Sequence, residues 1–235
     1  MGKIKDHNFR LWFSCVAGLP LLAVGLAVIF EYSGFDVWAV SHFYDFTSHS
    51  WPFRGHWLFY TVIHEWGRYL DMAAGGCWLV LFAGSFVSVR LKPYKKLMLY
   101  FIAAAVTGPL IVGALKHMTH IYTPWDLKIF SGTMPHIRIF DPVMPGLPVG
   151  EAFPAGHASG GYAFLALYFV LLRLGSPYRG YGLAAGLCLG LVFGIGQQVR
   201  GAHFPSHDLF TFAICWYCAL VTYFIFYPDE WRLRK

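Results

Sequence analysis

The 235-residue chain has 57% hydrophobic and 13% charged residues, and that charged share is about half of the share in soluble domains. A soluble chain of this length has too little interior to bury so much apolar material. The net charge of +6 does not indicate a nucleic-acid partner, because the basic residues lie between apolar segments and form no stripe. The composition therefore predicts one integral membrane domain over residues 1–235.

Neither the cysteines nor the N-terminal segment changes the assignment to an integral membrane protein. An odd number of cysteines inside apolar segments argues against a disulfide framework. The N-terminal apolar run lacks a convincing cleavage site, so we expect a retained first helix and not a removed signal peptide. The cysteines are Cys15, Cys77, Cys188, Cys215 and Cys218.

Six apolar stretches are each long enough to cross a bilayer, which takes about 20 residues. In lipid every backbone polar group must be satisfied within its own segment, so these stretches should be helices. The aromatic but charged segment Trp51–Trp66 predicts a short amphipathic helix at the membrane interface. The predicted fold is an all-α bundle of six transmembrane helices, Leu11–Phe30, Met72–Val89, Leu97–Leu115, Ala152–Leu172, Tyr181–Val199 and Leu209–Tyr227.

The distribution of basic residues predicts the orientation of the bundle. If each stretch crosses once, most of the 18 Lys and Arg residues share a side with the N-terminus. Because basic residues favour the cytoplasm, both termini should be cytoplasmic. The outer side then holds Glu31–Asp71, the turn Arg200–Asp208 and the loop Lys116–Glu151. That loop, rich in Pro, Gly and His, is long enough to indicate function.

Three polar clusters, far apart in sequence, fall on this outer side. Ionisable groups at this depth are costly to keep, so their convergence predicts a site. Any one cluster could be an interfacial anchor, but three on one side are harder to explain in that way. The clusters are Lys116, then Pro154-Ala155-Gly156-His157, and then Arg200, His203, His207 and Asp208.

The charges and backbone of these clusters suit a tetrahedral anion. Lys116 and Arg200 supply positive charge, and an arginine can hold two phosphate oxygens at once. The fourth helix should begin near Gly156, so free N–H groups around Ala155 and Gly156 would point at the same place. Two histidines can then divide attack on phosphorus and protonation of the leaving oxygen. The carboxylate-rich set of a magnesium phosphatase is missing, so we expect no metal and no cofactor.

The clusters also form three motifs with a defined order and spacing. They resemble the type 2 phosphatidic acid phosphatase superfamily of membrane lipid phosphatases over about residues 97–227. The family signature is Lys, six residues and Arg-Pro; then Pro-Ser-Gly-His; then Ser-Arg, five residues, His, three residues and Asp. This chain has Lys116, six residues and Thr123-Pro124; then Pro154-Ala155-Gly156-His157; then Gln197, five residues, His203, three residues and His207-Asp208.

The resemblance implies a role for each matching residue. His203 matches the nucleophile, which forms a phosphohistidine without metal. His157 matches the general acid that protonates the departing oxygen, and Lys116 matches a phosphate-binding cation. The implied substrates are lipid phosphates: undecaprenyl pyrophosphate, lipid A phosphate, phosphatidylglycerol phosphate or phosphatidic acid. A bacterial inner membrane with the site facing the periplasm would favour the first two.

Two arginines of the family signature are absent here. Thr123 stands for the first and Gln197 for the second. We expect Arg200, one helical turn after Gln197, to project into the same pocket. Arg138 in the long loop is a further candidate for a phosphate contact.

The carboxylate that orients the nucleophile is also displaced. The family aspartate position holds His207, and Asp208 follows one residue later. A carboxylate stabilises an imidazolium better than a second histidine does, so the sequence favours Asp208 for this role.

Other classes of function stay open at this point. A non-enzymatic lipid-phosphate binder or transporter would explain the missing arginines, although transporters place ionisable groups near the midplane of repeated halves. A haem protein would need facing histidines within the membrane, and the interiors of the predicted spans hold none. Within the family, both hydrolases and phosphotransferases are possible.

Overall fold

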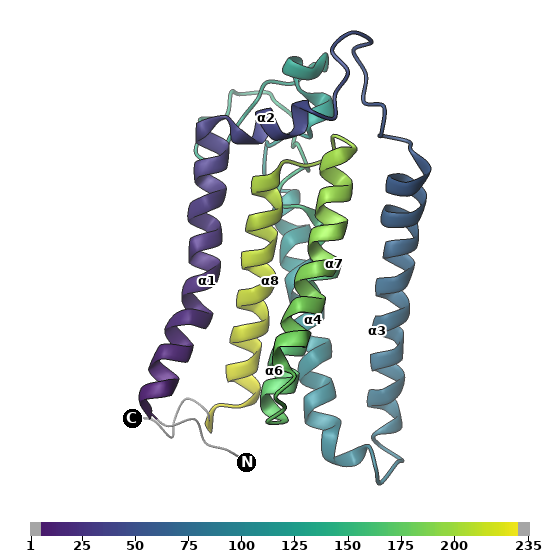
Figure 1. Cartoon of the computed structure of the whole chain (residues 1–235), viewed down its shortest axis with the longest axis vertical. Coiled ribbons are helices and arrows are strands. Elements are labelled where there is room, and N and C mark those ends of the chain that lie inside the picture. Colours follow the sequence, from purple (N-terminus) through teal and green to yellow (C-terminus); the bar gives the residue numbers. More distant parts are fainter. Residues whose placement is uncertain (1–5, 230–235) are drawn as a thin grey trace.

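The computed structural model describes residues 6–229, which form an elongated bundle of helices (Figure 1). Over these residues there is no β-strand, only the isolated bridges Asp45–Ser50 and Leu127–Met134. The prediction of an all-α fold is confirmed for this part of the chain. The longer helices are α1 (Asp6–Ser33), α3 (Gly67–Gly84), α4 (Lys95–Lys116), α7 (Arg179–Val199) and α8 (Pro205–Phe226), and the shorter ones are α2 (Phe35–Ser41), η1 (Leu58–Trp66), η2 (Lys92–Tyr94), η3 (Pro124–Asp126), η4 (Lys128–Phe130), α5 (Gly156–Ala163) and α6 (Ala166–Arg173).

Four helices of the described region are long and apolar enough to cross a membrane, namely α1, α4, α7 and α8. They correspond to four of the six predicted spans. The predicted span Met72–Val89 corresponds to α3, which has 18 residues and carries the charged residues Arg68 and Asp71 near its start. The predicted span Ala152–Leu172 is interrupted, because α5 ends at Ala163 and α6 begins at Ala166.

The interruption between α5 and α6 lies where α7 approaches most closely. A Cβ on Gly186 of α7 would collide with the backbone of Leu165. In the same way, a Cβ on Gly161 of α5 would collide with the backbone of Gly190 of α7. Glycines allow helices to approach backbone to backbone. At the break, the Phe164 N–H bonds to a carbonyl three residues back, that of Gly161, which tightens the turn.

The segment Trp51–Trp66 differs from its prediction as a separate interfacial helix. Its first part forms turns, and its second part is η1, a π-helix of nine residues. η1 continues directly into α3, so the two form one long helical segment.

Helix α8 lies at the centre of the bundle and contacts α1, α4 and α5. Its Trp216 is buried and donates from Nε1 to the carbonyl of Val16 in α1, at 2.6 Å. Pro20 lies four residues after Val16 and has no N–H, so the helix itself leaves that carbonyl without its usual partner. The Tyr217 hydroxyl donates to the next carbonyl, that of Ala17, at 2.8 Å.

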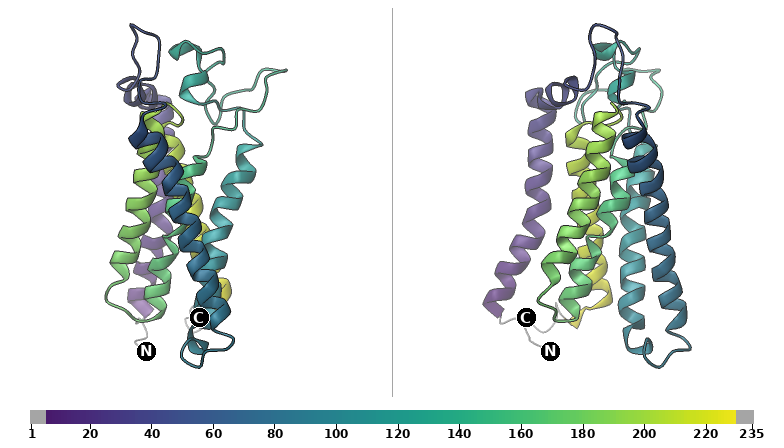
Figure 2. Two further views of the ribbon diagram at one scale, coloured as in Figure 1. Left: turned by 90° about the vertical axis from the view of Figure 1, so that its right-hand side faces the viewer. Right: turned by 45° about the vertical axis from the view of Figure 1, so that its right-hand side comes forward.

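The segments predicted to be outer loops gather at one end of the bundle (Figures 1 and 2). A small apolar cluster orders them against α2 and the turn after α7; its buried members include Val40, Tyr44, Tyr122, Phe130 and Phe204. The start of α1 and the end of α8 lie at the opposite end (Figure 1). The loop end is therefore a packed structure.

We expect Trp216→Phe to destabilise the bundle by about 1–3 kcal/mol, because it leaves the Val16 carbonyl buried without a donor. Pro20→Ala restores an N–H within α1, so Trp216→Phe should cost less in that background. Wild type, the two single variants and the double variant form a double-mutant cycle. Denaturant unfolding of these four proteins in detergent measures the coupling free energy between Trp216 and Pro20. Equal costs in both backgrounds would show that the Trp216 bond does not compensate for Pro20.

Candidate active site

The three polar clusters meet in one open cavity of about 610 Å³. Its walls come from η1, α3, α4, α5, the end of α7 and the loops after α4 and α7. The residues predicted from sequence that line the cavity are Lys116, Thr123, Gly156, His157, Gln197, Arg200 and His203. Those that do not line it are Ala155, His207, Asp208 and Arg138.

Lys116 ends α4, and its side chain lies against the first turn of α5. A Cβ on Gly156 would be 3.2 Å from Lys116 Nζ, so glycine makes room for the ammonium group. Lys116 has no ion pair within the described residues 6–229. Ala155 precedes α5 with an extended backbone and is buried beside Thr211, whose hydroxyl donates to its carbonyl. The free N–H groups of α5 and the lysine together favour an anion.

His157 is held by the π-helix η1. Its Nε2 donates to the carbonyl of Ile63 at 3.2 Å. In an α-helix this carbonyl would accept from Gly67, but the Gly67 N–H bonds to the carbonyls of His64 and Val62. A carbonyl can only accept, so the contact places a proton on His157 Nε2 and leaves Nδ1 as the variable nitrogen. The altered helical pattern thus supplies a backbone acceptor to the site, as π-bulges often do.

Arg200 lines the cavity from the end of α7, although only 6% of it is exposed. Its Nε donates to the Arg54 carbonyl at 2.9 Å, and its Nη1 donates to Gln197 Oε1 at 2.8 Å. The guanidinium also lies over the Tyr60 ring, 4.9 Å from its centroid. Within the described residues Nη2 has no hydrogen-bond partner, so it is available to an anion. Burial lowers the pKa of Arg200, but a guanidinium stays charged.

His203 lies in the turn between α7 and α8 and is 6% exposed. Its Nδ1 is 3.5 Å from Nδ1 of His207, the third residue of α8. Burial, with smaller effects of His207 and Lys116, lowers the pKa of His203 well below its ordinary value. The imidazole is therefore neutral at neutral pH, as attack on phosphorus requires.

A family model described as the PAP2 superfamily matches residues 97–231, more than half of the chain. The chain belongs to the PAP2 superfamily. The match includes Lys116, His157, Arg200 and His203, and it confirms the resemblance seen in the sequence. No curated protein and no solved structure matches the chain. Together with its apolar helices, family membership makes this PAP2 protein an integral membrane protein of a lipid-phosphatase family.

One wall of the PAP2 site comes from outside the matched residues. η1 and α3 precede residue 97 and contribute His64, Arg68 and Asp71 to the cavity. The His64 ring also packs on His157, with centroids 4.7 Å apart. Sequence reasoning missed these residues as part of the site. Charged residues at the start of an apolar span are a signal that could have pointed to Arg68 and Asp71.

Asp208 does not occupy the position that the sequence favoured. Its carboxylate accepts from Gln198 Nε2 and lies against Gly194 of α7. α8 begins at Pro205, and consecutive helical residues point about 100° apart. His207 therefore faces His203 while Asp208 faces α7, so the structure places His207 beside the candidate nucleophile.

Thr123 lines the cavity at the position of the first missing arginine, but its hydroxyl is already engaged. It donates to the carboxylate of Asp126. The next residue but one, Trp125, donates its backbone N–H to the Gly201 carbonyl at 3.1 Å. Thr123 thus helps to fix the loop after α4 against the turn that carries His203.

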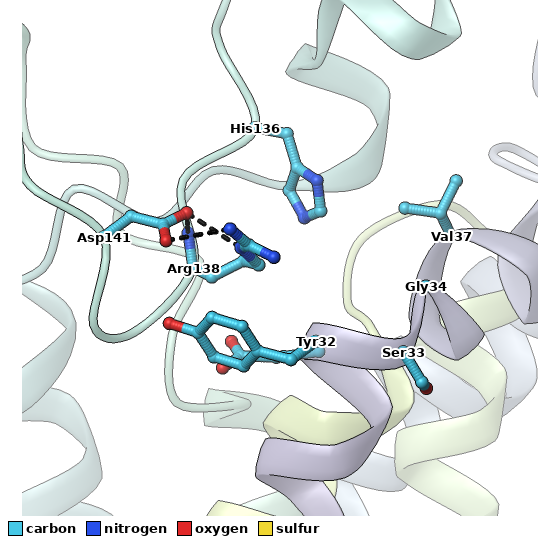
Figure 3. Close-up of a pocket in the computed structure, with 8 residues that line it drawn as sticks. Tyr32, Ser33, Gly34, Val37, His136, Arg138 and Asp141 are labelled. Atoms are coloured by element: carbon cyan, nitrogen blue, oxygen red, sulfur yellow. Dashed lines mark hydrogen bonds and ion pairs between the residues drawn. The ribbon is translucent and has the colours of Figure 1, made fainter.

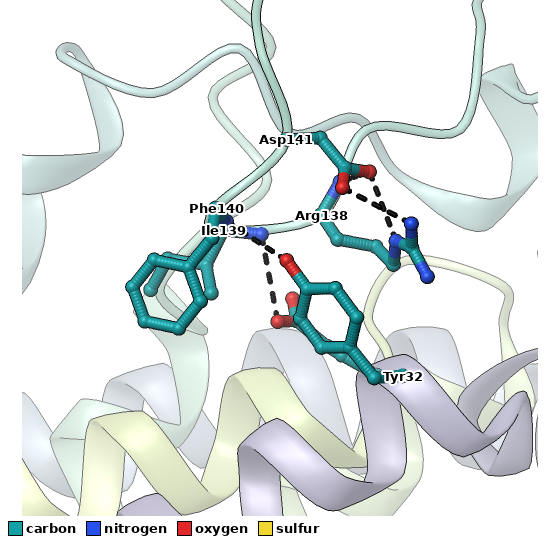
Figure 4. Close-up of polar contacts among 6 residues, drawn as sticks. Tyr32, Arg138, Ile139, Phe140 and Asp141 are labelled. Atoms are coloured by element: carbon teal, nitrogen blue, oxygen red, sulfur yellow. Dashed lines mark hydrogen bonds and ion pairs between the residues drawn. The ribbon is translucent and has the colours of Figure 1, made fainter.

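Arg138 lies in a second pocket of about 440 Å³, between the end of α1 and the long loop (Figure 3). Its Nε and Nη2 donate to the two carboxylate oxygens of Asp141 at 2.9 and 3.1 Å, and it lies 4.2 Å from the centroid of the Tyr32 ring. The Tyr32 hydroxyl accepts from the Phe140 N–H (Figure 4). These contacts attach the loop to α1, and the structure does not bring Arg138 to the cavity.

Asp36 of α2 is a further residue that sequence reasoning missed. It is buried, and its Oδ1 accepts from the Ser206 N–H at 3.0 Å. α8 has no side-chain cap from its own N-cap residue, Phe204. Asp36 therefore caps the helix that begins two residues after His203, and its burial raises its pKa to about 6.

We expect Asp36→Asn to flatten the pH dependence of stability. Folded Asp36 releases its proton near pH 6 and unfolded Asp near pH 4, so the native state binds more protons between these values. The unfolding free energy should therefore fall as pH rises through this window, by on the order of 2 kcal/mol. Asparagine keeps the oxygen that Ser206 needs but cannot ionise.

Denaturant unfolding in detergent at about pH 4.5 and about pH 7 tests this expectation. Asp45→Asn is the matched control, since that carboxylate is exposed in a turn at the same end of the bundle. The control should resemble wild type. An unchanged pH dependence in Asp36→Asn would show that another group titrates.

Proposed function

We propose that this PAP2 protein is a metal-independent lipid phosphatase with six transmembrane helices. It hydrolyses a lipid phosphomonoester or pyrophosphate through a phosphohistidine. The observation that carries the proposal is the meeting of His203, His157, Lys116 and Arg200 in one cavity at the loop end of the bundle. The reaction needs a nucleophile, an acid and cations together, and those residues come from separate parts of the chain.

The proposed orientation puts both termini in the cytoplasm and the cavity at the periplasmic face of a bacterial inner membrane. In support, the described ends of α1 and α8 lie at the end of the bundle opposite the cavity (Figure 1). α5 and α6 together make one crossing in this arrangement, and α3 with η1 makes another. The terminal basic residues that favour the cytoplasm, among them Lys3 and Lys235, lie outside the described residues.

In the proposed reaction, neutral His203 attacks phosphorus. A P–N bond forms as the P–O bond to the lipid breaks, and protonated His157 gives its proton to the departing oxygen. His157 then takes a proton from water, which attacks phosphorus and releases phosphate from His203. His207 accepts from the Nδ1–H of His203 and so directs Nε2 toward the substrate, a role that a carboxylate plays in the Ser-His-Asp arrangement.

Lys116, Nη2 of Arg200 and the first N–H groups of α5 hold the phosphate oxygens in this proposal. Gln197 does not replace the missing arginine as a cation, but its Oε1 positions Arg200. Such fixed positive groups stabilise the charge of the transition state. The candidate substrates are undecaprenyl pyrophosphate, lipid A phosphate, phosphatidylglycerol phosphate and phosphatidic acid.

A second candidate function is a lipid-phosphate binder or transporter without catalysis. The engaged side chain of Thr123 favours it, because that hydroxyl is bonded to Asp126 and is no substitute for an arginine. Phosphate release separates the two functions.

We expect detergent-purified protein to release phosphate from a lipid phosphate in the presence of EDTA. His203→Ala should lower the rate by at least about a thousandfold, because it removes the nucleophile. His42→Ala is the matched control, since that histidine directly follows α2 and does not line the cavity, and its rate should equal that of wild type. Loss of release in EDTA would contradict metal independence, and tight lipid binding without release would favour the binder.

We expect Arg200→Lys to lower kcat/KM by at least about tenfold, because lysine cannot reproduce the fork that bonds to Arg54, Gln197 and phosphate together. The matched control is Arg138→Lys, in the second pocket, which should stay within about twofold of wild type. Steady-state phosphate release measures both. A larger loss in Arg138→Lys would show that the loop arginine contacts the substrate.

A further inference from the structure

Asp71 of α3 is a carboxylate on the cavity wall that the mechanism above does not use. Its Oδ1 is buried without a hydrogen-bond partner, and it forms no ion pair within residues 6–229. Its Oδ2 lies against Gly160 of α5, where a Cβ would collide with it. An unpaired carboxylate in such a place lowers stability. Conflicts of this kind are expected where a side chain serves function.

The position of Asp71 relative to the phosphate follows from α5. Gly156 and Gly160 lie one turn apart on the same face of this helix. The Lys116 ammonium lies against the first glycine, and the Asp71 carboxylate lies against the second. The two groups therefore lie against positions of α5 that are about 6 Å apart along its axis.

The direction of this offset identifies what Asp71 faces. α5 follows the long loop and continues into α6, so it runs from the loop end into the bundle, and Asp71, which lies against Gly160, is deeper than Lys116, which lies against Gly156. With phosphate at Lys116, the carboxylate faces the part of the lipid that joins phosphate to the hydrocarbon chains. Within the described residues, no group donates a hydrogen bond to Oδ1 of Asp71.

We propose that Asp71 selects lipid phosphates that carry a hydrogen-bond donor on this linking part. The inference rests on the proposed lipid-phosphatase function and names its substrate class. The donor is a hydroxyl, an amide N–H or an ammonium group close to the phosphate. A lipid without such a donor leaves the carboxylate unpaired and is selected against, because sites built for a hydrogen bond discriminate strongly.

This selection divides the candidate substrates. Lipid A phosphate and phosphatidylglycerol phosphate carry hydroxyl or amide donors near their phosphates. Phosphatidic acid and undecaprenyl pyrophosphate carry none on the linking part, so they become the poorer substrates.

A matched pair of probes tests the proposal. Ceramide 1-phosphate has a hydroxyl and an amide N–H near a monoester phosphate, whereas phosphatidic acid has two esters there. We expect wild type to hydrolyse the first with a kcat/KM at least about tenfold higher. The full-length His203→Ala protein in detergent should show a similar preference in its two Kd values, measured without turnover.

Substitutions of Asp71 complete the test. Asp71→Ala should reduce the preference to within about twofold in both assays, without lowering thermal stability, because it removes an unpaired carboxylate. Asp71→Asn keeps an acceptor and should retain part of the preference. Asp141→Asn, in the second pocket, is the matched control and should leave the preference unchanged.

The outcomes separate the role of Asp71 from the phosphatase proposal. Equal binding of the two probes by His203→Ala, or a preference that survives in Asp71→Ala, overturns the role of Asp71 and leaves the phosphatase proposal standing. A binding preference that depends on Asp71, with no phosphate release by wild type from either probe or from any of the four candidate substrates, supports the role of Asp71 and overturns the phosphatase proposal.

Discussion

The close approach of α7 to α5 and α6 sets the position of the two helix ends that form the site. Gly186 and Gly190 leave no side chain between the helices, so the backbones of Leu165 and Gly161 lie directly against α7. Such contact allows little sliding, because any residue larger than glycine would collide. The start of α5, with His157, is thereby fixed opposite the end of α7, with Arg200. The turn after α7 then carries His203 into the same cavity.

Around this frame, the loop end is held by bonds between distant segments. Asp36 caps α8, η1 supplies a carbonyl to His157, and the Arg54 carbonyl holds Arg200. Each bond satisfies a group that would be costly to bury alone. A buried polar group that is left without a hydrogen-bond partner therefore indicates a role in function, and Asp71 on the cavity wall is such a group.

Much of this arrangement could be predicted from the sequence, because spacing along helices determines it. The apolar stretches predicted the all-α bundle, and the motif order predicted that Lys116, His157 and His203 would share a cavity. Arg200 reaches that cavity from one turn beyond Gln197, as helical periodicity indicates. The PAP2 match rests on the same stretch of chain.

The other features of the site depend on contacts between distant residues, and such contacts produce no pattern in the local sequence. Asp36 is 170 residues from Ser206, whose N–H donates to it. The Ile63 carbonyl accepts from His157 at a point where η1 departs from α-helical bonding. The choice between His207 and Asp208 depended on the residue at which α8 begins, because one position shifts a side chain by about 100°. The break between α5 and α6 likewise follows from packing on α7.

Detection of a phosphoryl group on His203 tests the central claim most directly. The full-length protein would be mixed with labelled lipid phosphate in EDTA, quenched in alkali and digested for mass spectrometry. The account predicts an acid-labile phosphate on the peptide that contains His203, and none in His203→Ala. Phosphate release by wild type with no phosphorylated peptide in a rapid-quench series, or label on another residue, would contradict it.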